Sequence, residues 1–365
     1  MKRILIFSTA FHPFVGGAEV AVKEITDRLP DFEFDMITIN LDGKQKPFEK
    51  LGNVMVYRIG SKGKMSKFLF PFVAFFKARM LHRRNHYDAT WSIMASYSGF
   101  AALFFKYRYR KIPFILTLQE GDPIAYIKRQ VWFVYPLFKK IFRKADYIQA
   151  ISHYLAQFAK DMGATCPVTV IPNGVDVTLF SKVIHKQHDG IVLITTSRLV
   201  EKNAVGDVIQ ALTLLPEHVS FLVLGVGELE SLLKQQVSDL KLDSRVHFKG
   251  YVGYKDIPEY LAQSDIFIRP SLSEGMGNSF VEAMAARIPV IGTNVGGIPD
   301  FLKDKETGIF CEVHDPKSIV QAVAYYIENK EAKEKIVLHA YALVSGSYDW
   351  NLIAQKMKTE IFARV

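Results

Sequence analysis

The sequence predicts an α/β protein with two Rossmann-like, doubly wound parallel-sheet domains, and three observations lead to this prediction. The chain has 365 residues, which is long for one hydrophobic core and suits two α/β domains. Short apolar runs alternate with helical patterns in both halves, which is typical of parallel sheets with crossover helices. The alternation restarts after a polar stretch at residues 182–190, so this stretch is expected to be a linker between two sheets.

The first half carries a regular series of expected elements. Strands are expected at residues 2–8, 34–39, 54–59, 89–93, 113–118 and 147–150. Helices are expected after Glu19 to about Leu29, then at 68–84, 96–107 and 129–143. Gly16 and Gly17 fall at the first strand-to-helix turn, where such folds bind ligands. Their spacing matches neither the dinucleotide fingerprint nor the Walker A loop, so the glycine pair alone indicates a turn.

The second half restarts with expected strands at residues 191–195, 221–224 and 266–268. The last of these leads into a glycine-rich loop and then into apolar positions at helical spacing. Ser279 and Glu282 have the form of a capping box, so a helix is expected to begin at Ser279. The loop before it would offer backbone N–H groups and a positive dipole end to a phosphate or a sugar oxygen.

Composition indicates an intracellular globular protein. Apolar residues make up 49% of the chain and charged residues 23%. The two cysteines, Cys166 and Cys311, are far apart and form no disulfide framework or zinc motif, which favours a reducing, cytoplasmic location. The start, MKRILIFSTAF, is too short for a signal peptide and fits a buried strand better. No apolar run reaches the roughly 20 residues needed to span a bilayer.

Charge is distributed unevenly along the chain. Residues 1–170 contain 26 Lys and Arg against 13 Asp and Glu, whereas the remainder contains 20 against 24. Aromatic and basic residues are mixed at residues 61–84 and 126–144, either as ordinary solvated faces or as a surface for anionic membrane lipids. The basic residues concerned are Lys62, Lys64, Lys67, Arg79, Arg83, Arg84, Lys139, Lys140 and Arg143. Nucleic acid ranks below membrane because no nucleic-acid-binding motif is present.

Two glutamates carry the most specific signal. Glu274 and Glu282 are separated by Gly-Met-Gly-Asn-Ser-Phe-Val. A surface loop and a capping box would explain them without a ligand, but the whole string resembles the Glu-x7-Glu signature of family 4 retaining glycosyltransferases. That family has the GT-B fold, in which two Rossmann-like domains face a central cleft. The resemblance implies that Glu274 contacts donor-sugar hydroxyls and that Glu282 binds the nucleotide ribose.

Further landmarks follow in the order expected for this family. Arg198 and Lys202 lie at the mouth of the second sheet, where a guanidinium fork and a point charge suit a diphosphate. In the family a matching pair grips the donor diphosphate, although the usual glycine after the lysine is Asn203 here. The other donor-binding residues implied by the resemblance are Gly275, Met276, Gly277, Asn278 and Ser279 of the loop, and Tyr251 and Val252 near the nucleotide base.

The first half resembles the family's acceptor side. Gly16 and Gly17 resemble its first glycine-rich loop, and Gln119, Glu120 and Asp122 follow an expected strand. Family members often carry a histidine near this point, whereas the amide of Gln119 can bind a sugar hydroxyl but cannot titrate. The domains implied are residues 1–180, joined by a C-terminal helix at 347–365, for the acceptor, and residues 181–346 for the donor.

The resemblance implies a retaining glycosyltransferase that uses a nucleotide diphospho-sugar and no cofactor. No Asp-x-Asp motif is present to hold a divalent ion, so metal-independent transfer is expected, with Glu274, Arg198 and Lys202 as the catalytic residues. The basic first half suggests a lipid-linked or envelope-destined acceptor at the inner face of a membrane. A nucleotide-sugar epimerase of the same fold and a catalytically silent sugar-nucleotide-binding protein are the alternatives. The donor base and sugar stay open.

Overall fold

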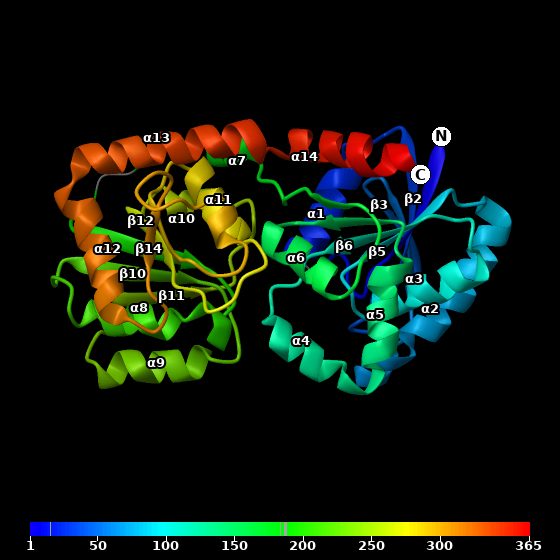
Figure 1. Ribbon diagram of the computed structural model, residues 1–365. Helices are drawn as coiled ribbons and strands as arrows, with labels where there is room; N and C mark the ends of the chain where they lie inside the picture. Colours follow the sequence, from blue (N-terminus) through cyan, green and yellow to red (C-terminus); the bar gives the residue numbers. More distant parts are fainter. Residues whose placement is uncertain (15, 183, 186–187) are drawn as a thin grey trace. The chain divides into compact units, whose positions relative to one another are not determined.

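The computed structural model describes residues 1–14, 16–182, 184–185 and 188–365, without the side chain of Lys64. The chain forms two compact units, one of Met1–Asn173 with Trp350–Val365 and one of Gly174–Asp349 (Figure 1). The sequence-based division after residue 180 falls at the end of α7 (Val177–Phe180), which belongs to the second unit. Residues 183, 186 and 187 of the expected linker lie outside the described residues.

The first unit contains, in the described chain, an eight-stranded sheet with the order β3-β4-β2-β1-β5-β6-β7-β8. Its strands are β1 (Lys2–Phe7), β2 (Phe32–Ile39), β3 (Phe48–Leu51), β4 (Val54–Ile59), β5 (Ala89–Ile93), β6 (Phe114–Leu118), β7 (Tyr147–Ala150) and β8 (Val168–Val170). All pairs are parallel except β3 with β4. The expectation of a wholly parallel sheet is therefore corrected at this edge. Gly52, with φ +58, turns the chain directly from β3 into β4.

Helices flank this sheet. They are α1 (Gly17–Asp27), α2 (Lys64–Asn85), α3 (Tyr97–Arg108), α4 (Ile124–Gln130), α5 (Tyr135–Lys144), α6 (His153–Asp161) and α14 (Trp350–Lys356). The single helix expected at 129–143 is wrong, because a 3₁₀ turn at Trp132–Val134 separates α4 from α5. Pro136 lies in the first turn of α5, a position that suits proline, whereas a helix running through it would lose a hydrogen bond.

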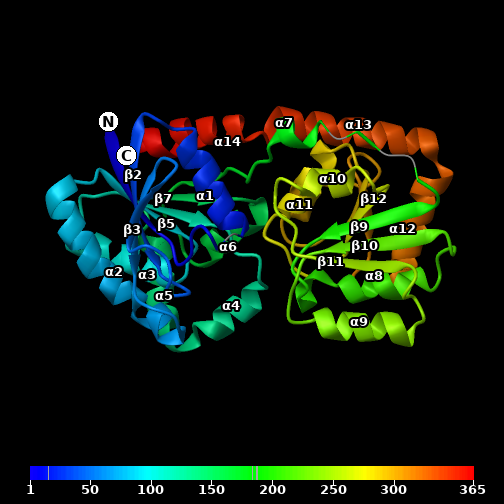
Figure 2. The same ribbon diagram turned by 180° about the vertical axis from the view of Figure 1, so that it is seen from behind.

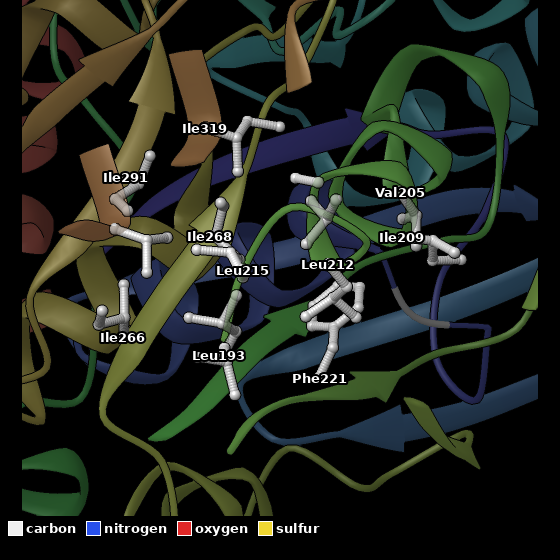
Figure 3. Close-up of a cluster of buried hydrophobic side chains, with 14 of the residues drawn as sticks. Leu193, Val205, Ile209, Leu212, Leu215, Phe221, Ile266, Ile268, Ile291 and Ile319 are labelled. Atoms are coloured by element: carbon white, nitrogen blue, oxygen red, sulfur yellow. The ribbon is translucent and has the colours of Figure 1, made fainter. Parts of the chain in front are cut away.

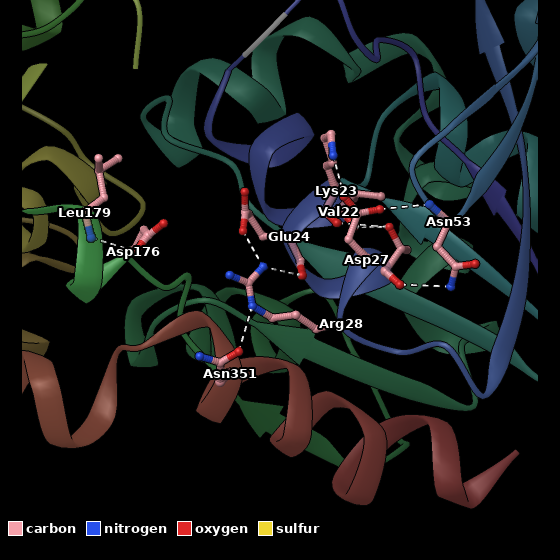
Figure 4. Close-up of polar contacts among 10 residues, drawn as sticks. Val22, Lys23, Glu24, Asp27, Arg28, Asn53, Asp176, Leu179 and Asn351 are labelled. Atoms are coloured by element: carbon pink, nitrogen blue, oxygen red, sulfur yellow. Dashed lines mark hydrogen bonds and ion pairs between the residues drawn. The ribbon is translucent and has the colours of Figure 1, made fainter. Parts of the chain in front are cut away.

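The C-terminal segment completes the core of the first unit. After α14 the chain continues through a π-helical turn (Met357–Ile361) and a 3₁₀ turn (Phe362–Arg364). The ring of Phe362 lies edge-on to Trp91 of β5, with 5.1 Å between the centroids. Arg28 at the end of α1 donates from Nε to Asn351 Oδ1 at 3.1 Å (Figure 4). Buried aromatic area and this polar contact thus attach the end of the chain to the first sheet.

The second unit contains, among the described residues, a six-stranded parallel sheet with the order β11-β10-β9-β12-β13-β14. Figure 2 gives the view from behind, in which β9, β10 and β11 lie side by side. The strands are β9 (Ile191–Thr196), β10 (Val219–Leu224), β11 (Val246–Gly250), β12 (Ile266–Arg269), β13 (Val290–Thr293) and β14 (Ile309–Cys311). The longer helices are α8 (Val205–Leu212), α9 (Glu230–Asp239), α11 (Asn278–Ala285), α12 (Pro316–Glu328) and α13 (Lys330–Ser347).

Shorter helical segments complete the second unit: α10 (Ile257–Leu261) and the 3₁₀ turns Glu201–Asn203 and Ile298–Asp300. Its core is aliphatic, as Figure 3 shows for Leu193, Leu212 and Ile268 around Phe221. Such interdigitated side chains hold the strands in fixed register. The strand ends, and therefore the loops that leave them, are rigidly placed within this unit.

Candidate functional site

The strand order of the second sheet reverses between β9 and β12. From β9 the chain proceeds outward through β10 and β11, and from β12 it proceeds the other way through β13 and β14. Open parallel sheets bind ligands outside the carboxyl ends of the strands at such a reversal. The loop after β9 contains Arg198 and Lys202, and the loop after β12 contains Glu274. The sequence-predicted donor residues therefore fall at the point where the topology favours binding.

Backbone hydrogen bonds join the three loops around this point. Leu272 N–H donates to the carbonyl of Lys202 at 2.7 Å, and Gly297 N–H donates to the carbonyl of Glu274 at 3.1 Å. Gly296 has φ +56, and a Cβ on it would lie 1.9 Å from the Glu274 carbonyl oxygen. A glycine is therefore required for the turn after β13 to approach the loop after β12. The loops after β9, β12 and β13 form one connected structure.

Glu274 is held at both carboxylate oxygens. Its Oε2 accepts from Arg269 Nη2 at 2.7 Å, and its Oε1 accepts from the N–H of Gly275 at 3.1 Å. The side chains of Glu274 and Arg269 are 16% and 7% exposed, so the pair is largely removed from water. Gly275 N–H is thus engaged within the loop. A carboxylate has further lone pairs, which leaves Glu274 able to accept from a ligand hydroxyl.

The start of α11 differs from the predicted capping box. The N-cap is Gly277, in the left-handed conformation with φ 100, and α11 begins at Asn278. Ser279 therefore lies inside the first turn rather than at the cap, and its Oγ accepts from Arg269 Nη1 at 2.7 Å. The Ser279 hydroxyl thus accepts its hydrogen bond from a buried guanidinium, whereas a capping serine would accept from a backbone N–H of the helix. The helix start is one residue earlier than predicted, and Glu282 has no capping role.

Glu282 lies on the second turn of α11 and is half-buried. Burial raises the pKa of its carboxyl to about 7, and the nearby charge of Arg269 acts in the opposite direction. The carboxyl therefore changes charge near neutral pH. A group in that state can accept a hydrogen bond from a ligand hydroxyl once ionised.

The two cations leave β9 on a short loop that Asn203 supports. Asn203 is buried, and its Nδ2 donates to the carbonyl of Arg198 at 2.7 Å. The side chain of Arg198 is exposed and that of Lys202 is half-buried. Asn203, where the family usually has glycine, thus ties the beginning of this loop to its end. Its amide provides a bond that a glycine could not.

The remaining predicted donor residues divide into structural and accessible groups. Met276 and Gly277 are buried, and Asn278 is half-buried at the helix start. Beyond β11, Tyr251 is 72% exposed and Val252 is half-buried. The carbonyl of Gly250, just before Tyr251, accepts from Gly225 N–H at 2.7 Å, which ties this segment to the loop after β10.

In the first unit the strand order reverses between β1 and β5. Gly16 is the N-cap of α1, and its N–H donates to Glu19 Oε2 at 2.8 Å, while Gly17 is the exposed first residue of the helix. The predicted glycine turn therefore follows β1 at the carboxyl edge of this sheet, next to the reversal. The Glu19 carboxylate already occupies one N–H of that turn.

The three residues predicted after β6, Gln119, Glu120 and Asp122, have different surroundings in the structure. Gln119 Oε1 accepts from Asn173 Nδ2 at 3.2 Å, and Asp122 is exposed. Glu120 Oε1 accepts from the N–H of Ala95, after β5, at 2.6 Å. Its Oε2 is buried and has no hydrogen-bond partner among the described residues. Burial raises the pKa of the Glu120 carboxyl to about 7.

Sequence reasoning missed Arg269. Arg269 is the last residue of β12, whose other three residues are apolar, and its charged side chain is buried with them. A charged residue at a position where the strand pattern calls for an apolar one was the available signal, since buried charges are paired.

Cys166 and Cys311 are free thiols. Within residues 1–14, 16–182, 184–185 and 188–365, no group of three or more His, Cys, Asp or Glu is arranged to hold a metal ion. None of the helices described there is long and apolar enough to cross a bilayer.

Two Rossmann-like units, the second with cations and carboxylates at its strand reversal, are the architecture of the GT-B class. Solved structures share this fold over the whole chain: sucrose-phosphate synthase from Thermosynechococcus elongatus has a TM-score of 0.86 at 17% identity, and Anabaena HepE in complex with UDP and glucose has 0.82 at 19%. Each comparison covers 100% of both chains.

Family models match both units. The model "Glycosyltransferase Family 4" matches residues 15–179, and "Glycosyl transferases group 1" matches residues 176–342. The GDP-mannose-dependent alpha-(1-6)-phosphatidylinositol monomannoside mannosyltransferase of Mycobacterium tuberculosis is 21% identical over 383 residues, covering 98% of this chain and 97% of that relative. The chain belongs to family 4 of the GT-B glycosyltransferases.

Proposed function

We propose that this glycosyltransferase transfers a sugar from a nucleotide diphospho-sugar, with retention of configuration and without a divalent metal ion. The bond from the anomeric carbon to the diphosphate oxygen breaks, and a bond to an acceptor hydroxyl oxygen forms on the same face of the sugar. The hydroxyl proton passes to the departing diphosphate. Positively charged groups fixed in advance at that diphosphate stabilise the charge that develops on it.

The observation that carries the proposal is the connection between the loops after β9 and β12. The hydrogen bond from Leu272 to Lys202 places the cation loop beside the loop that contains Glu274. In the proposed complex, Arg198 and Lys202 bind the diphosphate, and Glu274 accepts from donor-sugar hydroxyls. This division assigns charge neutralisation and sugar recognition to separate, rigidly connected segments.

The nucleotide is proposed to lie along the carboxyl edge of the second sheet. Glu282 would accept from the ribose hydroxyls, and Tyr251 and Val252 would flank the base. The Anabaena structure contains UDP, whereas the Mycobacterium tuberculosis relative is named for GDP-mannose, so both bases are candidates. On the acceptor side, Gly16, Gly17, Gln119, Glu120 and Asp122 are the proposed contacts.

A panel of UDP-, GDP- and ADP-sugars tests the donor assignment. A true donor should raise the melting temperature, because ligand binding to the native state stabilises it. It should then release nucleoside diphosphate, and the anomeric proton signal of the product should match the donor configuration. Inverted product would contradict retention, and an isomerised sugar nucleotide without transfer would support the epimerase alternative.

We further propose that the acceptor is a lipid-linked or envelope-destined sugar at an anionic membrane. Helix α2 supports this because it has two apolar faces. Phe70, Ala74, Ala78 and Leu81 are buried against the unit, whereas another stripe is 40–66% exposed: Met65, Phe68, Leu69, Phe72, Val73, Phe76 and Met80. Exposed Arg83 and Arg84 follow at the end of α2. An exposed apolar stripe beside basic residues suits a headgroup interface.

Vesicle co-sedimentation tests the membrane proposal. Acidic vesicles should bind the protein more strongly than zwitterionic ones, and salt should weaken the difference, since each basic residue near an anionic leaflet contributes about 1 kcal/mol. The exposed pair Leu69→Ser with Phe76→Ser should reduce the part of the binding that survives salt. Equal binding to both vesicle types, or none at low salt, would favour a soluble acceptor. The proposed location is the cytoplasmic face, in keeping with the two free thiols.

A further inference from the structure

Arg269 contacts every part of the loop that carries Glu274. Its Nε donates to Ser271 Oγ at 3.2 Å, its Nη2 to Glu274 Oε2 at 2.7 Å, and its Nη1 to Ser279 Oγ at 2.7 Å. The guanidinium also lies over the ring of Phe280, 4.8 Å from its centroid. One buried side chain thus reaches the loop start, its middle and the first turn of α11.

Such an arrangement is unlike a surface ion pair. Arg269 is 6% exposed, so its charge has lost most of its hydration and depends on these partners. The guanidinium is planar, and its N–H groups point in fixed directions, so the three oxygens must keep their relative positions to be bonded together. A lysine would keep the charge but present it as a single point, without this geometry.

The position of Arg269 also affects the second glutamate. Its charge favours the ionised form of Glu282, against the burial that raises the pKa of that carboxyl. A lysine at position 269 would keep this positive charge, so Arg269→Lys tests the hydrogen bonds that Arg269 makes and leaves its charge effect on Glu282 in place.

We infer that Arg269 is a positioning residue for sugar recognition: it fixes the Glu274 carboxylate and the start of α11 in the geometry that receives the donor sugar. This inference rests on the proposed function, in which Glu274 binds the sugar. Arg269 itself is buried, and in this inference it acts through Glu274. The proposed diphosphate-binding loop after β9 has its own support from Asn203, and its contact with the loop after β12 is a backbone hydrogen bond, from Leu272 to Lys202, that Arg269 does not make.

The test compares the affinity for the nucleotide sugar with that for the matching nucleoside diphosphate, which lacks the sugar. Arg269→Lys should reduce the advantage of the nucleotide sugar and lower kcat by about 10²-fold, since small misplacement of a catalytic group has effects of that order. Affinity for the nucleoside diphosphate should stay close to wild type. Glu274→Gln should lose the same advantage, and the double variant should lose little more.

Arg245→Lys is the matched control. Arg245 lies in the same unit and donates to backbone carbonyls, those of Val219, Leu215 and Pro216. It should lower the melting temperature without changing the affinity ratio. If Arg269→Lys folds poorly, Ser279→Ala removes one of the three bonds and should give a smaller reduction in the ratio.

Two negative results are distinguishable. Wild-type protein that binds no nucleotide sugar would overturn the proposed function and this inference with it. Wild-type binding together with an unchanged ratio and kcat in Arg269→Lys, or an equal change in Arg245→Lys, would overturn the positioning role alone.

Discussion

The carboxyl edges of the two sheets differ in how their polar side chains are hydrogen-bonded. In the second unit, the polar groups at the strand reversal are paired with one another: Glu274 with Arg269, Arg269 with Ser279, and the backbone of Lys202 with that of Leu272. In the first unit, Glu120 Oε2 is buried without a hydrogen-bond partner among the described residues, and so is His12 Nε2. At the second edge the carboxylate of Glu274 is paired, although the hydroxyls of Thr195 and Ser197 at the end of β9 are also buried without a hydrogen-bond partner among the described residues. At the first edge it is the carboxylate itself that has an oxygen without a partner.

This difference in hydrogen bonding affects which kind of ligand each edge suits. A carboxylate that a guanidinium holds in place, as Arg269 holds Glu274, recognises one ligand geometry repeatedly, which suits the donor common to every reaction cycle. A buried polar atom without a partner costs stability until a ligand or water supplies a hydrogen bond. The first edge thus suits an acceptor whose hydroxyls complete the site. The four predictions below test that distinction, from the largest expected effect to the smallest.

Lys202→Ala and Glu274→Ala should each lower the transfer rate by about 10²–10³-fold, because each removes a fixed charge from the proposed transition state. Lys202→Ala should keep the wild-type melting temperature, whereas Glu274→Ala leaves the buried Arg269 guanidinium without its ion-pair partner and should lower it. Initial rates and melting temperatures are the measurements. Lys234→Ala, an exposed lysine on α9 paired with Glu230, is the control and should keep wild-type turnover. Near-normal turnover in Lys202→Ala would remove the diphosphate contact.

Gly296→Ala should destabilise the second unit and weaken donor binding, because the new Cβ would meet the Glu274 carbonyl at 1.9 Å. Overpacking of this kind costs roughly 1–3 kcal/mol in addition to the strain of a positive φ. Gly250→Ala shares a positive φ but meets nothing within 4 Å, so it isolates the strain. Chemical denaturation of both variants gives the difference, and equal losses would show that the close approach is unimportant.

Glu120→Gln should change how stability depends on pH. Burial raises the pKa of Glu120 from 4.5 to about 7, so the folded state holds the proton more tightly than the unfolded state. The resulting stability is complete below pH 4.5 and is lost as the pH rises through 7, by up to about 3 kcal/mol. The glutamine keeps the Ala95 contact and does not titrate. Denaturation at several pH values should show a flatter profile in Glu120→Gln, and an unchanged slope would argue against a buried carboxyl.

Chelation should have the smallest effect. Because Arg198 and Lys202 are proposed to neutralise the diphosphate, transfer rates with and without EDTA should agree. Loss of activity in EDTA that returns with Mg²⁺ or Mn²⁺ would reassign charge neutralisation from these side chains to an ion.

Local sequence patterns were sufficient for some of the regular elements. The strands expected at 89–93 and 147–150 have the predicted bounds, because short apolar runs bounded by polar residues can be buried only in the interior of a sheet. The helix expected at 129–143 was wrong, since helical periodicity continues across Pro136 although the hydrogen-bond ladder does not. The edge strand β3 was missed because its four residues carry too short a pattern.

The sequence by itself therefore determined the two alternating α/β halves, the family 4 resemblance and the loops on which the candidate residues lie. Only the tertiary structure decided how those residues are paired. Ser279 and Glu282 read locally as a capping box, yet Ser279 receives a hydrogen bond from Arg269, ten residues earlier. Glu120 has the local pattern of a loop carboxylate. In the structure one of its oxygens accepts a hydrogen bond from the N–H of Ala95, in the loop after β5, and the other oxygen is buried. The physical reason is that burial and partner choice depend on which strand ends meet, and neighbours along the chain do not specify this.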